Sequence, residues 1–235
     1  RLKRLWAVSK RGTVYLLSPE LETAPSFPLL TGEDVSAPPL AADDRVYIPL
    51  SAGPSILSVD ATSVLERSEP LGSRLHAAPV SSGNGLVFLP RSFDSSLYYM
   101  DYNGQIKTGW PVYLAGIASA KALIFSPSGR GPEEESVRIA AVTEAGELSV
   151  YLEDGSMQSG FPVKLDGTYD TAPVWSDGSL SLYALSVEGV LWRIHLDGTV
   201  ASSVAIPRGP ARGATLTALD CNEDGFEELY VSGGG

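Results

Sequence analysis

One phrase of twelve residues occurs twice in this chain and constrains the fold more than any other feature of the sequence. The first copy, residues 103–114, reads NGQIKTGWPVYL, and the second, residues 154–165, reads DGSMQSGFPVKL. Each copy joins an Asn-Gly or Asp-Gly turn to a Gly-aromatic-Pro-Val sequence. Two copies of so specific a pattern indicate a repeat architecture, in which each repeat buries its apolar surface against its neighbours.

The proline of this phrase marks further, more divergent repeats. Its counterparts stand at intervals of 42, 41, 51 and 45 residues: Pro28, Pro70, Pro111, Pro162 and Pro207. An Ala-Pro step lies upstream in three repeats, at Ala37-Pro38, Ala78-Pro79 and Ala172-Pro173. We therefore divide the sequence into repeats at residues 1–32, 33–72, 73–116, 117–167 and 168–209, with a partial repeat at 210–235.

Each repeat consists of short apolar runs with Gly, Asp and Ser between them. Alternation of apolar and polar residues predicts β-strands, and Asn-Gly or Asp-Gly steps predict hairpin turns. The expected strands include residues 5–8, 13–17, 45–48, 56–59, 86–89, 97–100, 123–125, 137–142, 148–152, 180–185, 190–195, 200–206, 215–219 and 229–231. The last strands of the first three repeats are expected to end near Pro28, Pro70 and Pro111.

Four-stranded antiparallel units that repeat every 40–50 residues are typical of a β-propeller. We predict an all-β chain, residues 1–235, that forms a single β-propeller domain. The first repeat lacks its first strand, and the last repeat supplies two strands. The chain therefore predicts about six blades, or a segment of a propeller with seven to eight blades.

Composition excludes several classes of function. The formal net charge of -11 opposes binding to nucleic acid or to an anionic membrane surface. No apolar run approaches the roughly 18 residues that a membrane span needs. The chain begins at Arg1 without a signal-like apolar segment, so we expect a fragment from which a targeting sequence is missing.

The sharpest chemical signal is the acidic sequence DCNEDGFEE, residues 220–228. Odd spacing places Asp220, Asn222 and Asp224 on the inside of a tight loop, and Gly225 permits the reversal. The Phe226 carbonyl and the Glu228 carboxylate can complete a set of hard oxygen ligands of the kind that Ca²⁺ prefers. We predict a structural Ca²⁺ site here; the alternative is a solvated acidic turn, because Asp, Asn and Gly are ordinary turn residues.

The order of these motifs resembles two families of bacterial extracytoplasmic propellers. An Ala-Pro-Val step, a valine-rich strand, a glycine and the Gly-Phe-Pro-Val phrase look like quinoprotein-like and FG-GAP-like repeats. The acidic loop is similar to the calcium loop between the first two strands of an FG-GAP repeat, as in integrin α-type propellers. That resemblance implies the ligands Asp220, Asn222, Asp224, Phe226 through its carbonyl, and Glu228.

Other chemistry-bearing residues are few. Arg193, His195 and Asp197 alternate along one strand, and a polar outer face explains them better than a relay. His76 precedes a first strand, which lines the axial channel of a propeller, and is a candidate functional residue. The loop of residues 126–136 is a candidate partner contact, because long loops on a short-looped scaffold often carry function. Cys221 has acidic neighbours and no adjacent base, so we expect it to be inert.

These observations favour a non-catalytic propeller that binds a protein partner in the bacterial envelope or outside the cell. The sequence contains no Gly-x-Ser-x-Gly nucleophile elbow, no phosphate loop and no His-Glu-x-x-His metalloprotease motif that would suggest an enzyme. Two alternatives stay open. One is a quinone-dependent dehydrogenase or another enzyme with its site at the channel mouth. The other is a carbohydrate-binding propeller, so that a glycan is a second candidate ligand.

Overall fold

Six antiparallel sheets make up the part of the chain that the structure describes. This computed structural model describes residues 4–75, 77–90, 95–118, 120–127, 136–207 and 212–233. These residues contain 21 strands and no helix. The chain divides into unit 1, residues 1–92 and 98–107, and unit 2, residues 93–97 and 108–235. That residues 1–235 form one domain stays a prediction.

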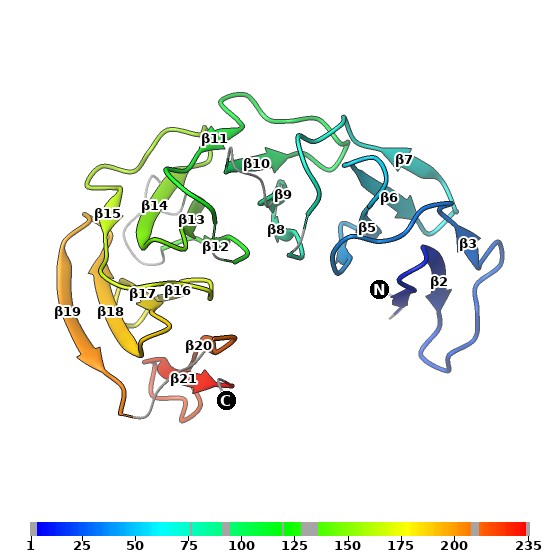
Figure 1. Cartoon of the computed structure of the whole chain (residues 1–235). Helices are drawn as coiled ribbons and strands as arrows, with labels where there is room; N and C mark the ends of the chain where they lie inside the picture. Colours follow the sequence, from blue (N-terminus) through cyan, green and yellow to red (C-terminus); the bar gives the residue numbers. More distant parts are fainter. Residues whose placement is uncertain are drawn as a thin grey trace. The chain divides into compact units, whose positions relative to one another are not determined.

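Unit 1 holds a three-stranded sheet, a four-stranded sheet and most of a third sheet (Figure 1). The first sheet has the order β1-β2-β3: Leu5–Val8, Thr13–Leu17 and Leu29–Leu30. The second has the order β4-β5-β6-β7: Leu40–Ala42, Arg45–Pro49, Ile56–Asp60 and Leu65–Arg67. The third has the order β8-β9-β10-β11: Val80–Ser82, Gly85–Phe88, Ser96–Met100 and Val112–Tyr113; of these, Ser96, Leu97 and β11 belong to unit 2.

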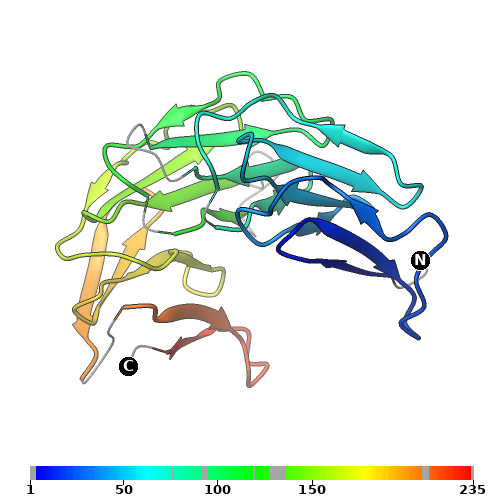
Figure 2. The same cartoon turned by 45° about the vertical axis from the view of Figure 1, so that its right-hand side comes forward.

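Unit 2 continues with two four-stranded sheets and a two-stranded sheet. The first has the order β12-β13-β14-β15: Leu123–Phe125, Arg138–Val142, Glu147–Leu152 and Val163–Lys164. The next has the order β16-β17-β18-β19: Val174–Ser176, Ser181–Leu185, Val190–His195 and Val200–Ala205. The last pairs β20, Thr215–Leu219, with β21, Glu228–Ser232. Figures 1 and 2 show β16–β19 in yellow and orange and β20–β21 in red.

The predicted fold class is confirmed, because every sheet is an antiparallel meander of consecutive strands. Five of the expected strands have the predicted bounds, and the others given by residue range differ by one residue at one or both ends. The last strands of the first three repeats differ more, because β3 and β11 begin after Pro28 and Pro111, and β7 ends at Arg67, before Pro70. Proline has no N–H with which to continue the ladder. Beyond it, the Leu71 amide instead donates to the Pro54 carbonyl at 2.6 Å.

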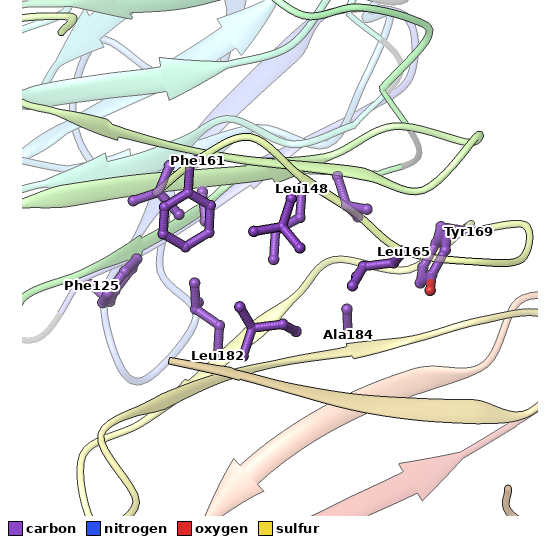
Figure 3. Close-up of a cluster of buried hydrophobic side chains, with 12 residues drawn as sticks. Phe125, Leu148, Phe161, Leu165, Tyr169, Leu182 and Ala184 are labelled. Carbon is purple, nitrogen blue, oxygen red and sulfur yellow. The ribbon is translucent and has the colours of Figure 1, made fainter. Parts of the chain in front are cut away.

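Apolar side chains join the β12–β15 and β16–β19 sheets of unit 2. Figure 3 shows Phe161 and Leu148 opposite Leu182 and Ala184, and all four side chains are buried. Fully burying a side chain such as leucine contributes about 1.5–3 kcal/mol. The alternation that predicted the strands therefore also supplies the apolar faces by which the sheets pack.

The two copies of the repeated phrase, which connect β10 to β11 and β14 to β15, pack against each other within unit 2. A Cβ atom on Gly109 would lie 2.0 Å from the carbonyl oxygen of Asp154, and one on Gly155 would lie 2.3 Å from that of Gly109. In the next pair of sheets, a Cβ atom on Gly160 would lie 1.8 Å from the carbonyl oxygen of Asp197. The glycine before each aromatic residue thus packs directly on the Asp-Gly turn of the following sheet.

The aromatic residue of the phrase strengthens the same joint. The Trp110 indole Nε1 donates a hydrogen bond to the Glu153 carbonyl at 3.0 Å, and its ring lies edge-on to Tyr151 with centroids 6.1 Å apart. In unit 1, Phe27 lies edge-on to Trp6. Phe161 belongs to the buried cluster between the β12–β15 and β16–β19 sheets, and Phe27 packs against the cluster that β5 and β6 supply. The peptide bonds from these three residues to the following prolines are cis.

We expect Gly160→Ala to destabilise the protein much more than Gly32→Ala. Both glycines have positive φ, +90° and +79°, which costs an L-residue about 1–2 kcal/mol. Only Gly160 also abuts a neighbouring backbone, whereas a Cβ atom on Gly32 meets nothing within 4 Å. Overpacking adds about 1–3 kcal/mol. Calorimetric melting of both variants measures the difference. Equal melting temperatures would contradict the close packing of Gly160 on the Asp197-Gly198 turn.

Candidate functional site

One end of the β16–β19 sheet gathers the residues with the most chemical character. The β16–β17 turn, residues 177–180, and the β18–β19 turn, residues 196–199, lie at this end because the strands run antiparallel. The loop between β20 and β21 touches the same end through Glu227. The predicted calcium loop, the His195 cluster and a pocket are therefore neighbours in unit 2.

The predicted metal loop lies between the first two strands of the last sheet, as expected. The Asp220 carboxylate accepts hydrogen bonds from the amides of Asp224 at 3.2 Å and Gly225 at 2.9 Å. The Phe226 amide donates to Asp224 Oδ1 at 2.9 Å, and the Cys221 amide donates to Glu228 Oε2 at 3.0 Å. These bonds fold the loop back on itself around its own carboxylates.

The side chain of Asn222 connects two of the predicted ligands. Its Nδ2 donates to Asp224 Oδ2 at 3.0 Å and to Glu228 Oε1 at 2.9 Å. Within the described ranges, no group of three or more His, Cys, Asp or Glu side chains is arranged to hold a metal ion. The loop offers hard oxygen donors and contains no cationic residue, which is the donor chemistry that Ca²⁺ requires. The Ca²⁺ site stays a prediction.

Glu227, which the sequence analysis did not single out, fastens this loop to the neighbouring sheet. Its Oε2 accepts hydrogen bonds from the Ser176 hydroxyl at 2.8 Å and the Gly178 amide at 2.9 Å. Partial burial opposes ionisation, but these bonds hold the pKa of Glu227 below its ordinary value. No motif marks this residue, because its partners lie about 50 positions earlier in the chain.

His195 belongs to a hydrogen-bonded cluster on the same end of the sheet. Ser181 Oγ lies 3.0 Å from Arg193 Nε and 3.3 Å from His195 Nδ1, and it donates its proton to the Ser179 carbonyl at 2.9 Å. The Ser181 hydroxyl thus contacts both Arg193 Nε and His195 Nδ1, and the donor and acceptor roles of the ring nitrogens depend on the tautomer. Arg193 and His195 share a face of β18, as predicted, whereas Asp197 lies in the turn after the strand.

Two hollows border these elements within unit 2. A groove of about 750 Å³ runs along the first strands of three sheets, β12, β16 and β20, and includes Lys121 and Asp170. Asp170 Oδ2 accepts a hydrogen bond from the Gly213 amide. A smaller pocket of about 380 Å³ lies over the turns and is lined by Pro127, Trp175, Ser179, Leu180, His195, Leu196 and Asp197.

The remaining candidates have different outcomes. His76 and residues 128–135 of the 126–136 loop lie outside the described residues, so their predicted roles stay predictions. Cys221 is an exposed free thiol in the acidic loop. The described part of the chain contains no helix long and apolar enough to cross a membrane.

Comparison with known proteins identifies the fold. No family model matches the chain, and no curated protein matches it. Solved structures do match: BBS1N in complex with ARL6DN has 12% identity and a TM-score of 0.61, covering 97% of this chain and 69% of that one. This chain is a β-propeller.

Two further propellers give the same result. Hsv2 from Kluyvelomyces marxianus has 10% identity and a TM-score of 0.64, and the match covers 99% of this chain and 82% of Hsv2. BamB from Moraxella catarrhalis has 13% identity and a TM-score of 0.51, and the match covers 97% of this chain and 79% of BamB. At these identities the likeness shows the fold alone.

We expect Glu227→Gln to lower the melting temperature at neutral pH, because a charge-assisted anchor is lost. The cost should be about 1 kcal/mol for this partly exposed group. Since the folded-state pKa lies below 4.5, the stabilisation is present above about pH 4.5 and lost as pH falls through the folded-state value. The difference from wild type should therefore shrink between pH 7 and about pH 3.5.

The matched control is Glu223→Gln, which changes an exposed carboxylate of the same loop. This variant should melt like the wild type throughout the pH range. If Glu227→Gln melts at the same temperature as the wild type and Glu223→Gln, the Glu227 carboxylate does not fasten the loop.

Proposed function

We propose that this β-propeller is a non-catalytic scaffold that binds a protein partner. The observation that carries the proposal is the end of unit 2 that holds the turns 177–180 and 196–199, the first of which is bonded to the loop 220–227. Loops on a rigid sheet are the common place for binding residues. The solved propeller BBS1N, which shares this fold, is in complex with ARL6DN, and this supports a protein partner.

The described side chains also speak against catalysis. Ser181 is buried and its oxygen is already bonded to three groups, so it is not available as a nucleophile. The neighbours of Cys221 are the Glu228 carboxylate and the Tyr230 hydroxyl, neither of which is a strong base. The groove along β12, β16 and β20 presents one lysine and one aspartate among mostly small and apolar residues. A quinone cofactor would need several Arg, Asp and Trp side chains from separate blades.

The acidic loop is proposed to hold one structural Ca²⁺ ion. Its ligands would be Asp220, Asn222, Asp224, the Phe226 carbonyl and Glu228. The ion would neutralise carboxylates that now face one another around Asn222. The loop is fastened to the β16–β17 turn by Glu227, so ordering it would also order the proposed binding end.

The same reasoning supports a location in the bacterial envelope or outside the cell. Weak calcium loops are filled where the ion is abundant, with dissociation constants of about 0.1–1 mM in extracellular modules. The repeat phrases resemble those of extracytoplasmic propellers, and the net charge of -11 is compatible with such a setting. Fractionation of source cells followed by detection of the native protein tests the location.

Calcium should raise the melting temperature, and EDTA should lower it. A site with a dissociation constant of about 0.5 mM would add about 1.4 kcal/mol at 5 mM Ca²⁺. Asp224→Ala should abolish this response, whereas Glu223→Gln should retain it. Calorimetry with Ca²⁺, with Mg²⁺ and with EDTA makes the measurement. Identical melting of wild type in all three conditions would remove the metal from the proposal.

Affinity capture of the purified protein with envelope extract tests the scaffold itself. We expect a stoichiometric protein partner that is retained more strongly in Ca²⁺ than in EDTA, because the ion orders the loop of the binding end. Cross-linking followed by mass spectrometry should place that partner on residues 177–180, 196–199 or 220–227. A partner attached only elsewhere, or none in either condition, would contradict the proposed binding end.

A further inference from the structure

The pocket over the β16–β17 and β18–β19 turns has a distinctive lining. Its polar groups are the Asp197 carboxylate, the His195 ring and the Ser179 hydroxyl, and Trp175, Leu180 and Leu196 supply apolar surface. Ser179 Oγ accepts a hydrogen bond from the Tyr183 hydroxyl at 3.2 Å. With about 380 Å³, the pocket is large enough for one long side chain.

The polar lining mainly accepts hydrogen bonds. The Asp197 carboxylate is acceptor-only when ionised, and the amide of Thr199 keeps its pKa below the ordinary value. His195 contributes its imidazole ring, of which Nδ1 contacts the Ser181 hydroxyl. Ser179 is the one lining side chain that also offers a hydroxyl donor. An occupant with several N–H or O–H donors therefore matches this surface.

Charge decides between a neutral and a cationic occupant. Asp197 is the carboxylate that lines the pocket. Two more carboxylates belong to the adjoining turn of residues 177–180: Asp177 accepts a hydrogen bond from Trp175 Nε1 at 2.8 Å, and Glu227 accepts one from the Asp177 amide. The opposing charge is Arg193, whose guanidinium is bonded to Ser181 and to the Ser179 carbonyl beneath the turns. The protein as a whole carries a formal charge of -11, which draws cations toward it.

The backbone at the pocket is also unusual. Leu180, which lines it, has a φ of 47°, in the left-handed region that a leucine rarely adopts. Such strain is unfavourable and tends to occur where a side chain must be held in place for function. The turn that carries Leu180 is the one fastened by Glu227.

We infer that this pocket binds a basic side chain, a guanidinium or an ammonium group, of a partner protein. The inference rests on the proposed protein-binding function and names the chemistry that the partner presents. The cation would lie against the Asp197 carboxylate and donate to the acceptors around it, with its aliphatic stem along Leu180 and Leu196. The Trp175 indole, which also lines the pocket, would attract a cation that lies over its ring.

The chain itself supplies a matched pair of variants. Asp197 and Asp154 occupy the same position of the repeated turn, and each accepts a hydrogen bond from the amide two residues later. Only Asp197 is among the lining residues of the pocket. Asn103 fills the equivalent position of the third repeat, so Asp→Asn is compatible with the turn. Asp197→Asn therefore removes a carboxylate that lines the pocket, and Asp154→Asn removes an equivalent carboxylate that does not.

The test is a titration of the whole chain with N-acetylarginine amide and with its neutral isostere, N-acetylcitrulline amide. The indole N–H signals of the four tryptophans are followed by NMR, and Trp175→Phe identifies the signal of Trp175. We expect N-acetylarginine amide to shift that signal and N-acetylcitrulline amide to leave it in place. Asp197→Asn should weaken the response at least about tenfold, and Asp154→Asn should leave it unchanged.

Several outcomes would overturn the inference. These are an equal response to the citrulline compound, a response to methyl glucoside instead, equal losses in both Asp→Asn variants, or no shift of the Trp175 signal. Capture from the envelope extract with wild type and Asp197→Asn then separates the two proposals. A protein partner retained equally by both would leave the scaffold function standing and remove the basic side chain as its recognition element.

Discussion

The close backbone contact between neighbouring sheets is the constraint on which the rest of this structure depends. The glycine before each repeated aromatic residue lies against the Asp-Gly turn of the next sheet, at separations that leave no room for a Cβ atom. In unit 1 a serine takes the place of that glycine, and Gly104 packs against Ser68. This contact brings the apolar faces close enough to interdigitate, and aromatic rings such as Trp110 and Phe161 fill the space beside it.

The same contact determines what the turns can do. The Asp197-Gly198 turn is held against Gly160, so the Asp197 carboxylate projects from a backbone that is fixed by packing. Glu227 fixes the turn of residues 177–180 from the other side. The binding end of unit 2 is therefore an arrangement of short, tightly held turns, and its recognition chemistry depends on a few side chains at defined positions.

Much of the fold could be predicted because its signals are local. Strands such as Thr13–Leu17 and Val190–His195 show alternation within a few residues, and Gly12, Gly155 and Gly198 mark turns with positive φ. Gly53 lies between β5 and β6, as Gly12 lies between β1 and β2, but it does not have a positive φ. The presence of a glycine alone therefore does not determine the turn geometry. The acidic loop was found for the same reason, since its oxygen-bearing residues lie within nine positions. Whether it binds Ca²⁺ stays a prediction.

By itself, the sequence determined the repeat, the strands, the fold class and the place of the acidic loop, because each depends on residues close together along the chain. Only the tertiary structure decided which distant residues meet. Glu227 reaches a turn about 50 positions away, and Ser181 contacts Arg193 and His195 from the neighbouring strand. The pocket beside Asp197 draws on three sequence segments. Such contacts follow from sheet register and packing, for which a single sequence carries no local signal.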